Sequence, residues 1–341
     1  MIYSKNEIIN FITTTLNVDA SKISLTTLNA DGNMTAKLEE GGSDSLILVK
    51  VDSKEYVLKT KSNAFGKNVC DAMNYLQESS FIEKFKKGYA IFYIRDNYNR
   101  EEKVYKIIEK FSMYTPKLFG AISDNNRSII LMEKLDICRD VDLEKASSFL
   151  RKFHSEFNNK KDLAIENGIN IHTKEDYSNA KDLSLTLIDY VEKAYPSFPR
   201  YIVETCRKFV KNFEQNFEKI AKYSQTICHG DFTSNNTSYG NSFKVYDFEL
   251  ATYQNPEFDI ISFLVHYPNL VNNQTIERFL TLYYKGKPTK KERESLSLNT
   301  LIYFTTRFHA MMLICKNVSM EYMETSIKNY ISVFDYFVKC F

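Results

Sequence analysis

The chain has 341 residues, of which 43% are hydrophobic and 26% are charged, and its formal net charge is only +2. This length is enough for one large domain or two moderate ones around a packed core. The near balance of charge argues against a nucleic-acid-binding protein, which usually carries a basic face, and against a strongly acidic surface built to attract polycations.

The six cysteines are scattered and none forms a CxxC pair, so neither a zinc site nor a disulfide framework is expected. Reduced cysteines are typical of the cytoplasm, which is the predicted location. The opening stretch, MIYSKNEIINFITTTLNV, is not a signal peptide, because polar residues interrupt every apolar run. No apolar run reaches the length of about 18 residues that a membrane-spanning helix needs, so no contact with a membrane is predicted.

The first part of the chain reads as one helix followed by short strands. Apolar residues spaced along one helical face predict an amphipathic helix over residues 4–16. Between residues 22 and 60, four runs have the composition of strands and are separated by turn residues: ISLTTLNADG, MTAKLEE, SLILVKV and EYVLKT. A helix is predicted over residues 67–86, and the run YAIFYI after it reads as a strand.

Beyond residue 98 the chain becomes mainly helical. Residues 100–111 show helical spacing, and PKLFGAISDNNRSIILMEKLD reads as two strands joined by the polar turn SDNN. Further helices are predicted over residues 142–157, 175–195, 199–222, 257–268, 273–285, 290–315 and 319–340. A β-rich first part and a helix-rich second part predict an α+β fold with two lobes.

Residues 227–260 concentrate polar side chains within the helical half. The runs NNTSY and SFKVYDF flank a Gly-Asn pair, which predicts a hairpin with a two-residue turn. In that register residue 236 faces residue 245, so Asn236, Asp247 and Glu249 share one face of the hairpin. An amide oxygen and carboxylates are ligands that suit Mg²⁺, with phosphate and water oxygens completing its shell.

Asp231 lies in the loop before this hairpin, where a carboxylate can accept the proton of an attacking hydroxyl group. Asn236 follows Asp231 by five residues and Asp247 follows it by 16, in the order of the catalytic Asp, the Asn and the metal-binding Asp of the kinase pattern. A polar hairpin whose Asp and Asn residues only make turns is the alternative. The joint order and spacing favour a catalytic site.

The motifs HGDFTSNN, VYDFE and FDI resemble the aminoglycoside phosphotransferase and choline kinase superfamily, which consists of protein-kinase-like small-molecule kinases. The sequence DFE is closer to the choline kinase-like branch. The resemblance implies a two-lobed protein-kinase-like fold with a β-rich N-lobe and a mainly helical C-lobe. Residues 1–134 would form the nucleotide-binding lobe, and residues 135–341 the catalytic and substrate-binding lobe. ATP and Mg²⁺ are the implied cofactors, and GTP in place of ATP stays open.

The resemblance also assigns roles in the second lobe. Asp231 would be the catalytic base, and Asn236 and Asp247 would hold Mg²⁺. Glu249 is a candidate further metal ligand. His229 and Asp259 would support the catalytic loop.

In the first lobe, EEGGSDSLILVKV resembles the turn that covers the phosphates, which points to Gly41, Gly42 and Ser43. The run EYVLKT resembles the strand whose lysine, here Lys59, grips the α- and β-phosphates. An ordinary hairpin turn and a solvated strand lysine are the respective alternatives.

The run REEKVYKII resembles the helix whose glutamate pairs with that lysine; Glu101 is the first candidate and Glu102 the second. An acid at an exposed helix start, favoured by the helix dipole, is the alternative. The run IILMEKLD resembles the hinge, where the main chain of Glu133 and Leu135 would bind adenine. Residues 62–98 exceed the usual spacing of the superfamily and are predicted to be an insertion, with an elaborated helix as the alternative.

Only 11 residues separate Asp247 from Asp259, and no APE motif follows, so no protein-docking segment is predicted. The predicted function is transfer of the γ-phosphoryl group of ATP to a hydroxyl group of a small molecule, either choline- or ethanolamine-like or another metabolite. An aminoglycoside or other antibiotic kinase and a non-catalytic pseudokinase that serves as a binding module are the alternatives. The oligomeric state stays open.

Choline would need an aromatic cage for cation–π contact. The C-terminal helices supply aromatic residues at helical spacing, and core packing is the simpler interpretation of them. These residues are Tyr303, Phe304, Phe308 and Tyr322.

Overall fold

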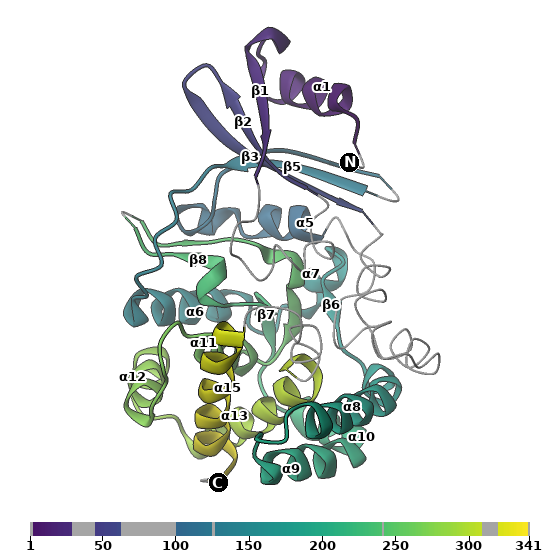
Figure 1. Ribbon diagram of the computed structural model, residues 1–341, viewed down its shortest axis with the longest axis vertical. Helices are drawn as coiled ribbons and strands as arrows, with labels where there is room; N and C mark the ends of the chain where they lie inside the picture. Colours follow the sequence, from purple (N-terminus) through teal and green to yellow (C-terminus); the bar gives the residue numbers. More distant parts are fainter. Residues whose placement is uncertain are drawn as a thin grey trace.

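The computed structural model describes residues 3–28, 45–62, 100–124, 127–240, 242–308 and 320–339, which form a sheet-containing lobe and a helical lobe (Figure 1). The first lobe contains a five-stranded antiparallel sheet in the order β1-β2-β3-β5-β4. Its strands are β1 (Ile23–Thr27), β2 (Ser45–Val51), β3 (Lys54–Ser62), β4 (Leu118–Ser123) and β5 (Arg127–Glu133). The predicted strand MTAKLEE and the elements predicted between residues 63 and 99 lie outside the described residues, as does nearly all of the predicted insertion.

Two helices lie on opposite sides of this sheet. Helix α1 (Lys5–Leu16) packs on one face, and helix α5 (Arg100–Ile107) lies between the other face and the helical lobe (Figure 1). Side chains alternate between the two faces: Ile129 and Leu131 of β5 join the α1 cluster, whereas Ile130 and Met132 join the core of the helical lobe. The sheet therefore presents one strand face to the other lobe.

The helical lobe contains most of the remaining elements. Its α-helices are α6 (Leu143–Phe157), α7 (Lys161–Glu166), α8 (Lys174–Ala194), α9 (Arg200–Lys211), α10 (Phe213–Ile220), α11 (Glu257–Val265), α12 (Asn273–Tyr284), α13 (Lys290–Tyr303) and α15 (Met320–Phe334). Short 3-10 and π-helical turns occupy Ala20–Lys22, Glu109–Tyr114, Ser234–Asn236, Phe248–Leu250, Phe304–Phe308 and Asp335–Lys339.

The single helix predicted over residues 199–222 is wrong, because the chain forms two helices, α9 and α10, that meet at Asn212. The Asn216 side chain donates a hydrogen bond of 2.9 Å to the carbonyl of Phe209, near the end of α9. This bond satisfies a carbonyl that the interrupted helix leaves without its usual partner. The break was not predicted because the apolar spacing continues across it.

The predicted hairpin register is also wrong. Strands β8 (Thr237–Ser238) and β9 (Lys244–Val245) pair Thr237 with Val245 and Ser238 with Lys244, one position away from the predicted register. A shift of one residue moves side chains to the opposite face. Asp247 consequently does not share a strand face with Asn236. A second small sheet, in the order β6-β10-β7, supports the loop before the hairpin; its strands are β6 (Asn170–Ile171), β7 (Thr226–Cys228) and β10 (Thr252–Gln254).

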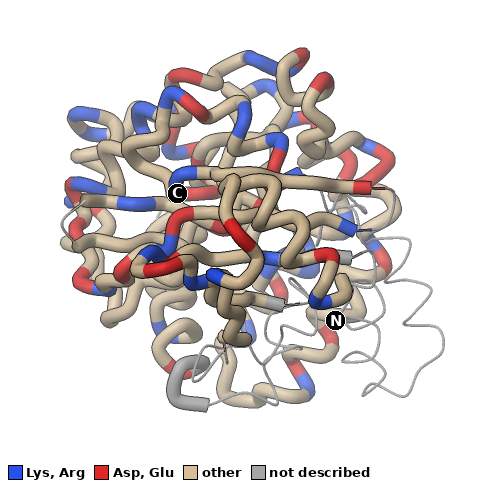
Figure 2. The backbone as a smooth tube through the Cα atoms, turned by 90° about the horizontal axis from the view of Figure 1, so that it is seen from above, with Lys and Arg blue, Asp and Glu red and all other residues tan. Residues whose placement is uncertain are grey.

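Basic and acidic residues are interspersed along the described chain and do not gather into regions of one sign (Figure 2). This distribution agrees with the small net charge of +2. Within the described ranges, no helix combines the length and the apolar character that a membrane crossing requires.

Helix α11 is buried along its whole length and begins with an acidic residue, Glu257. Burial raises the pKa of Glu257 to about 7, although Ser295 and Tyr284 donate hydrogen bonds to its carboxyl group. Between its ordinary pKa and about pH 7, the folded protein thus holds a proton that the unfolded chain has released. This group makes the fold less stable as the pH rises through that interval.

We expect the Glu257→Gln variant to lack the fall in stability with rising pH that Glu257 causes. Between pH 5 and pH 8, the wild-type free energy of unfolding should fall by about 2–3 kcal/mol relative to that of the variant. Urea denaturation of both proteins at the two pH values measures the difference. Parallel pH dependences of the two proteins would contradict the assignment.

Candidate active site

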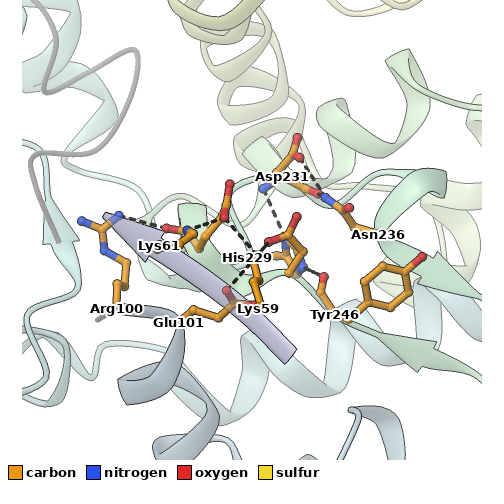
Figure 3. A network of polar contacts seen from close by, with 10 residues as sticks. Lys59, Lys61, Arg100, Glu101, His229, Asp231, Asn236 and Tyr246 are labelled. Carbon is orange, nitrogen blue, oxygen red and sulfur yellow. Dashed lines mark hydrogen bonds and ion pairs between the residues drawn. The ribbon is translucent and has the colours of Figure 1, made fainter. Parts of the chain in front are cut away.

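Lys59 lies at the centre of a cluster of carboxylates contributed by both lobes. Strand β3 places its side chain on the sheet face opposite α1, where it is buried. Its Nζ lies 2.9 Å from Glu101 of α5, 2.5 Å from Asp247 and 3.0 Å from Glu249 (Figure 3). The Lys59–Glu101 pair is the one expected from the sequence. Glu102 instead pairs with Lys106 on the same helix.

The charges in this cluster shift one another's pKa values. Burial acts to lower the pKa of Lys59, but the charges of Asp247, Glu101 and Glu249 raise it well above its usual value. Burial, together with the charge of Glu249, raises the pKa of Asp247 to about 7. A second lysine, Lys61, forms an ion pair with Glu249, and the two lysines hold the pKa of Glu249 well below its usual range despite its burial.

The backbone at Asp247 explains how this residue reaches Lys59. Asp247 follows β9 and adopts the left-handed conformation, with φ of 67° and ψ of 56°. This conformation ends the strand and begins the 3-10 turn Phe248–Leu250, so Asp247 and Glu249 both turn toward Lys59. The sequence prediction assumed a continuing strand, in which a shared face would have brought these residues together.

Phe248, between the two acidic residues, is fully buried among rings from both lobes. It packs edge-on against Tyr105 of α5 at 5.6 Å between ring centroids, and against Phe153 of α6 at 6.0 Å. The ring of His229 lies 4.5 Å away. These contacts hold the Asp247–Glu249 turn in place from both sides.

The loop that carries Asp231 begins with His229 and Gly230. The amide of Asp231 donates to Nδ1 of His229 at 3.3 Å, and Nε2 of the same ring donates to the carbonyl of Tyr246 at 2.9 Å. Burial lowers the pKa of His229, which agrees with a neutral ring that has one donor and one acceptor nitrogen. Gly230 has φ of +82°, and a Cβ atom there would lie 1.8 Å from the carbonyl oxygen of Leu250, so only glycine fits.

Asp231 and Asn236 contact each other directly (Figure 3). The side-chain nitrogen of Asn236 donates to the backbone carbonyl of Asp231 at 2.9 Å and to its Oδ2 at 2.8 Å. These bonds leave the other carboxylate oxygen of Asp231 and the amide oxygen of Asn236 as further hydrogen-bond acceptors or ligand atoms. The residues predicted to bind the metal thus form two groups. Asn236 lies beside Asp231, whereas Asp247 and Glu249 lie beside Lys59.

Asp259, in the first turn of α11, is fully buried beneath the loop that carries Asp231. It accepts hydrogen bonds from the amides of His229, at 2.7 Å, and Gly230, at 2.9 Å. Nε2 of His154 on α6 lies 3.1 Å from the same carboxylate, and Nδ1 of His154 lies 2.9 Å from the hydroxyl of Tyr283. Asp259 thus connects the loop to α6 and, through His154, to α12.

The hinge candidates lie where the sheet lobe ends. Glu133 is the last residue of β5, and its amide donates to the carbonyl of Lys117 at 2.9 Å. Leu135 is partly buried in the irregular segment that leads to α6. Gly41, Gly42 and Ser43 lie outside the described residues, so the predicted phosphate-covering turn stays a prediction.

The aromatic residues considered for a cation cage belong to the core. Tyr303, Phe304 and Phe308 are buried, which agrees with the simpler interpretation of their spacing, and the side chain of Tyr322 lies outside the described part. The hydroxyl of Tyr303 lies 3.0 Å from Nε2 of His266. Burial lowers the pKa of His266, while the charge of Asp231 acts to raise it.

Several residues that shape the site were not singled out from the sequence. Lys61 was missed, although alternation along β3 places it on the same face as Lys59. Arg139, in the segment between the lobes, contacts the carbonyls of Ser234, Asn235 and Thr237 with its Nη1 at 2.7–2.9 Å. No local pattern connects Arg139 to a turn almost 100 residues later in the chain.

The donors in the cluster fit a divalent cation. Oxygen atoms of Glu101, Asp247 and Glu249 lie within 4.8 Å of one another. Mg²⁺ prefers carboxylate oxygens together with phosphate oxygens and water. Three carboxylates face only two lysine ammonium groups in this cluster, and this excess of negative charge favours binding of a further cation.

Comparisons with known proteins identify the fold. A sequence model of the ecdysteroid kinase-like family matches residues 144–286, whereas no curated protein matches the sequence. The structure is similar to choline kinase LicA from Streptococcus pneumoniae, with 14% identity, a TM-score of 0.55 and coverage of 96% of this chain and 99% of that one.

It is also similar to a choline kinase from Cryptosporidium parvum, with 10% identity, a TM-score of 0.54 and coverage of 97% and 95% of the two chains. LicA in complex with AMP matches with 14% identity, a TM-score of 0.51 and coverage of 97% of each chain. The chain therefore has the two-lobed α+β fold of the protein-kinase-like small-molecule kinases. The predicted resemblance to this superfamily and the predicted fold class are confirmed.

We expect Asp259→Ala to destabilise the protein, because it removes the acceptor of two buried amides. Each unsatisfied donor costs about 1–3 kcal/mol, so the free energy of unfolding should fall by about 2–5 kcal/mol. Asp259→Asn should lose less, because its amide oxygen can still accept one of these bonds. Urea denaturation of wild type, Asp259→Asn and Asp259→Ala measures the order of their free energies of unfolding. Equal stabilities for wild type and Asp259→Ala would contradict the bracing role.

Proposed function

We propose that this chain is a kinase that uses ATP and Mg²⁺ to transfer the γ-phosphoryl group to a hydroxyl group of a small molecule. The observation that carries the proposal is the ion-paired cluster of Lys59, Glu101 and Asp247, and the Asp231–Asn236 hydrogen bond on the catalytic loop supports it. A fold alone does not establish an activity, so the proposal depends on these groups.

In this proposal the nucleotide binds between the two lobes, next to Lys59. Adenine bonds to the main chain of Glu133 and Leu135, and the boundary between the lobes lies at residues 134–135. Lys59 moves from Asp247 and Glu249 to the α- and β-phosphates, while Glu101 remains paired with the Lys59 ammonium group and keeps it in position. The predicted turn at Gly41, Gly42 and Ser43 covers the phosphates.

Asp231 is the proposed base. One of its oxygens is fixed by Asn236, and the other accepts the hydroxyl proton as the acceptor oxygen attacks phosphorus. His229 and Asp259 orient the loop through hydrogen bonds to its backbone. Asn236, Asp247 and Glu249 would hold Mg²⁺, which offsets the charge of the phosphates when it is bound.

Amino alcohols such as choline and ethanolamine are the first acceptor class to examine. The sequence DFE and the similarity to two choline kinase structures support this choice. An antibiotic acceptor is the second class, because the same groups would act on any suitably placed hydroxyl. The proposed location is the cytoplasm, in agreement with the free thiols of Cys138, Cys206 and Cys228 in the described ranges.

The proposal predicts that purified protein releases ADP from ATP and Mg²⁺ when the correct acceptor is present. A panel of amino alcohols, sugars and aminoglycosides, with coupled detection of ADP, identifies the class. In Asp231→Asn, the stimulated rate should fall by about 10²–10⁴, whereas the affinity for ATP should stay within about twofold. An Asp231→Asn protein with full activity would contradict the assignment of the base.

Asp247→Ala should separate metal binding from nucleotide binding. Because Asp247 would bind Mg²⁺, the gain in ATP affinity that Mg²⁺ provides should fall by about tenfold or more, which is about 1.4 kcal/mol. Fluorescence titration of an ATP analogue with and without Mg²⁺ measures this gain. Asp136→Ala, at a fully exposed position, is the control and should behave like wild type. If Mg²⁺ increased the affinity for ATP equally in Asp247→Ala and wild type, the assignment of Asp247 as a metal ligand would be wrong.

A further inference from the structure

Lys61 occupies an unusual place for a strand lysine. It lies two residues after Lys59 on β3, and alternation along the strand gives both lysines the same sheet face. Only 11% of its side chain is exposed, and its Nζ forms an ion pair with the carboxylate of Glu249 (Figure 3). Lysine side chains are seldom buried to this extent without a partner that needs their charge.

The partner of Lys61 is a candidate metal ligand. Glu101, Asp247 and Glu249 bring three carboxylates to a cluster in which Lys59 and Lys61 form the ion pairs. A cation bound by Asp247 and Glu249 would neutralise the negative charge of Glu249, which Lys61 neutralises in this structure. Lys61 would then be a nearly buried ammonium group that needs a new anion close by.

The position of Lys61 along β3 indicates which anion that is. Tyr56 pairs with Glu133 at the hinge, Lys59 pairs with Ile130, and Lys61 pairs with Ser128. At about 3.4 Å per residue, Lys61 is about 7 Å farther from the hinge than Lys59 is. A nucleotide whose base lies at the hinge extends its phosphates in this direction, so the outermost phosphates approach Lys61 rather than the base or the ribose.

We propose that Lys61 is a second phosphate-binding residue, which exchanges Glu249 for the terminal phosphates of the nucleotide when the metal ion binds. This inference rests on the proposed function, because it assumes that a nucleotide binds with its base at the hinge. The alternative is that Lys61 only holds Glu249 in position, in which case it contributes nothing to phosphate affinity.

The test compares nucleotides that differ in their number of phosphates. The affinities of wild type and Lys61→Met for ATP, ADP and AMP are measured by calorimetric titration with Mg²⁺ in excess. We expect Lys61→Met to bind ATP about tenfold more weakly, and AMP within about twofold of wild type. Lys61→Arg, which keeps the charge, should recover most of the affinity for ATP.

Lys54→Met is the matched control, because Lys54 is an exposed lysine on the same strand. It should bind all three nucleotides like wild type. Unchanged ATP affinity in Lys61→Met would overturn the inference and leave the kinase proposal intact. Equal losses for ATP and AMP would also overturn it, because they would indicate a distorted strand. A wild-type protein that binds no nucleotide would overturn both this inference and the proposed function.

Discussion

The site depends on the ion pairs that the buried ammonium group of Lys59 forms. This group joins β3 and α5 of the sheet lobe to the Asp247–Glu249 turn of the helical lobe through three ion pairs. Inside a protein, a charge that loses its partner costs several kcal/mol, so these groups depend on one another. The relative placement of the lobes around Lys59 is therefore set by electrostatics as well as by apolar packing.

The sequence was sufficient to predict features that depend on local order and spacing. The helix at residues 4–16, the five strands of the large sheet and the Lys59–Glu101 pair all correspond to the structure. These predictions succeeded because apolar periodicity and fixed motif spacing are encoded within short segments.

The remaining features depend on contacts that short segments do not encode. Two ladder pairs define the β8–β9 hairpin, so composition specified its register only weakly. The left-handed turn at Asp247 was not expected of an aspartate, since glycine and asparagine adopt this conformation more readily. The Lys61–Glu249 pair joins residues almost 190 positions apart, and only the assembled fold brings them together.

The location of Phe248 has a mechanical consequence. Its ring lies between the two acidic residues and contacts Tyr105 of one lobe and Phe153 of the other. Close-packed rings resist separation more than an irregular connecting segment does, so displacement of the lobes is smallest at this contact. Separation of the lobes would thus pivot near Phe248, so the Asp247–Glu249 turn would stay close to α5 while more distant parts of the lobes moved apart.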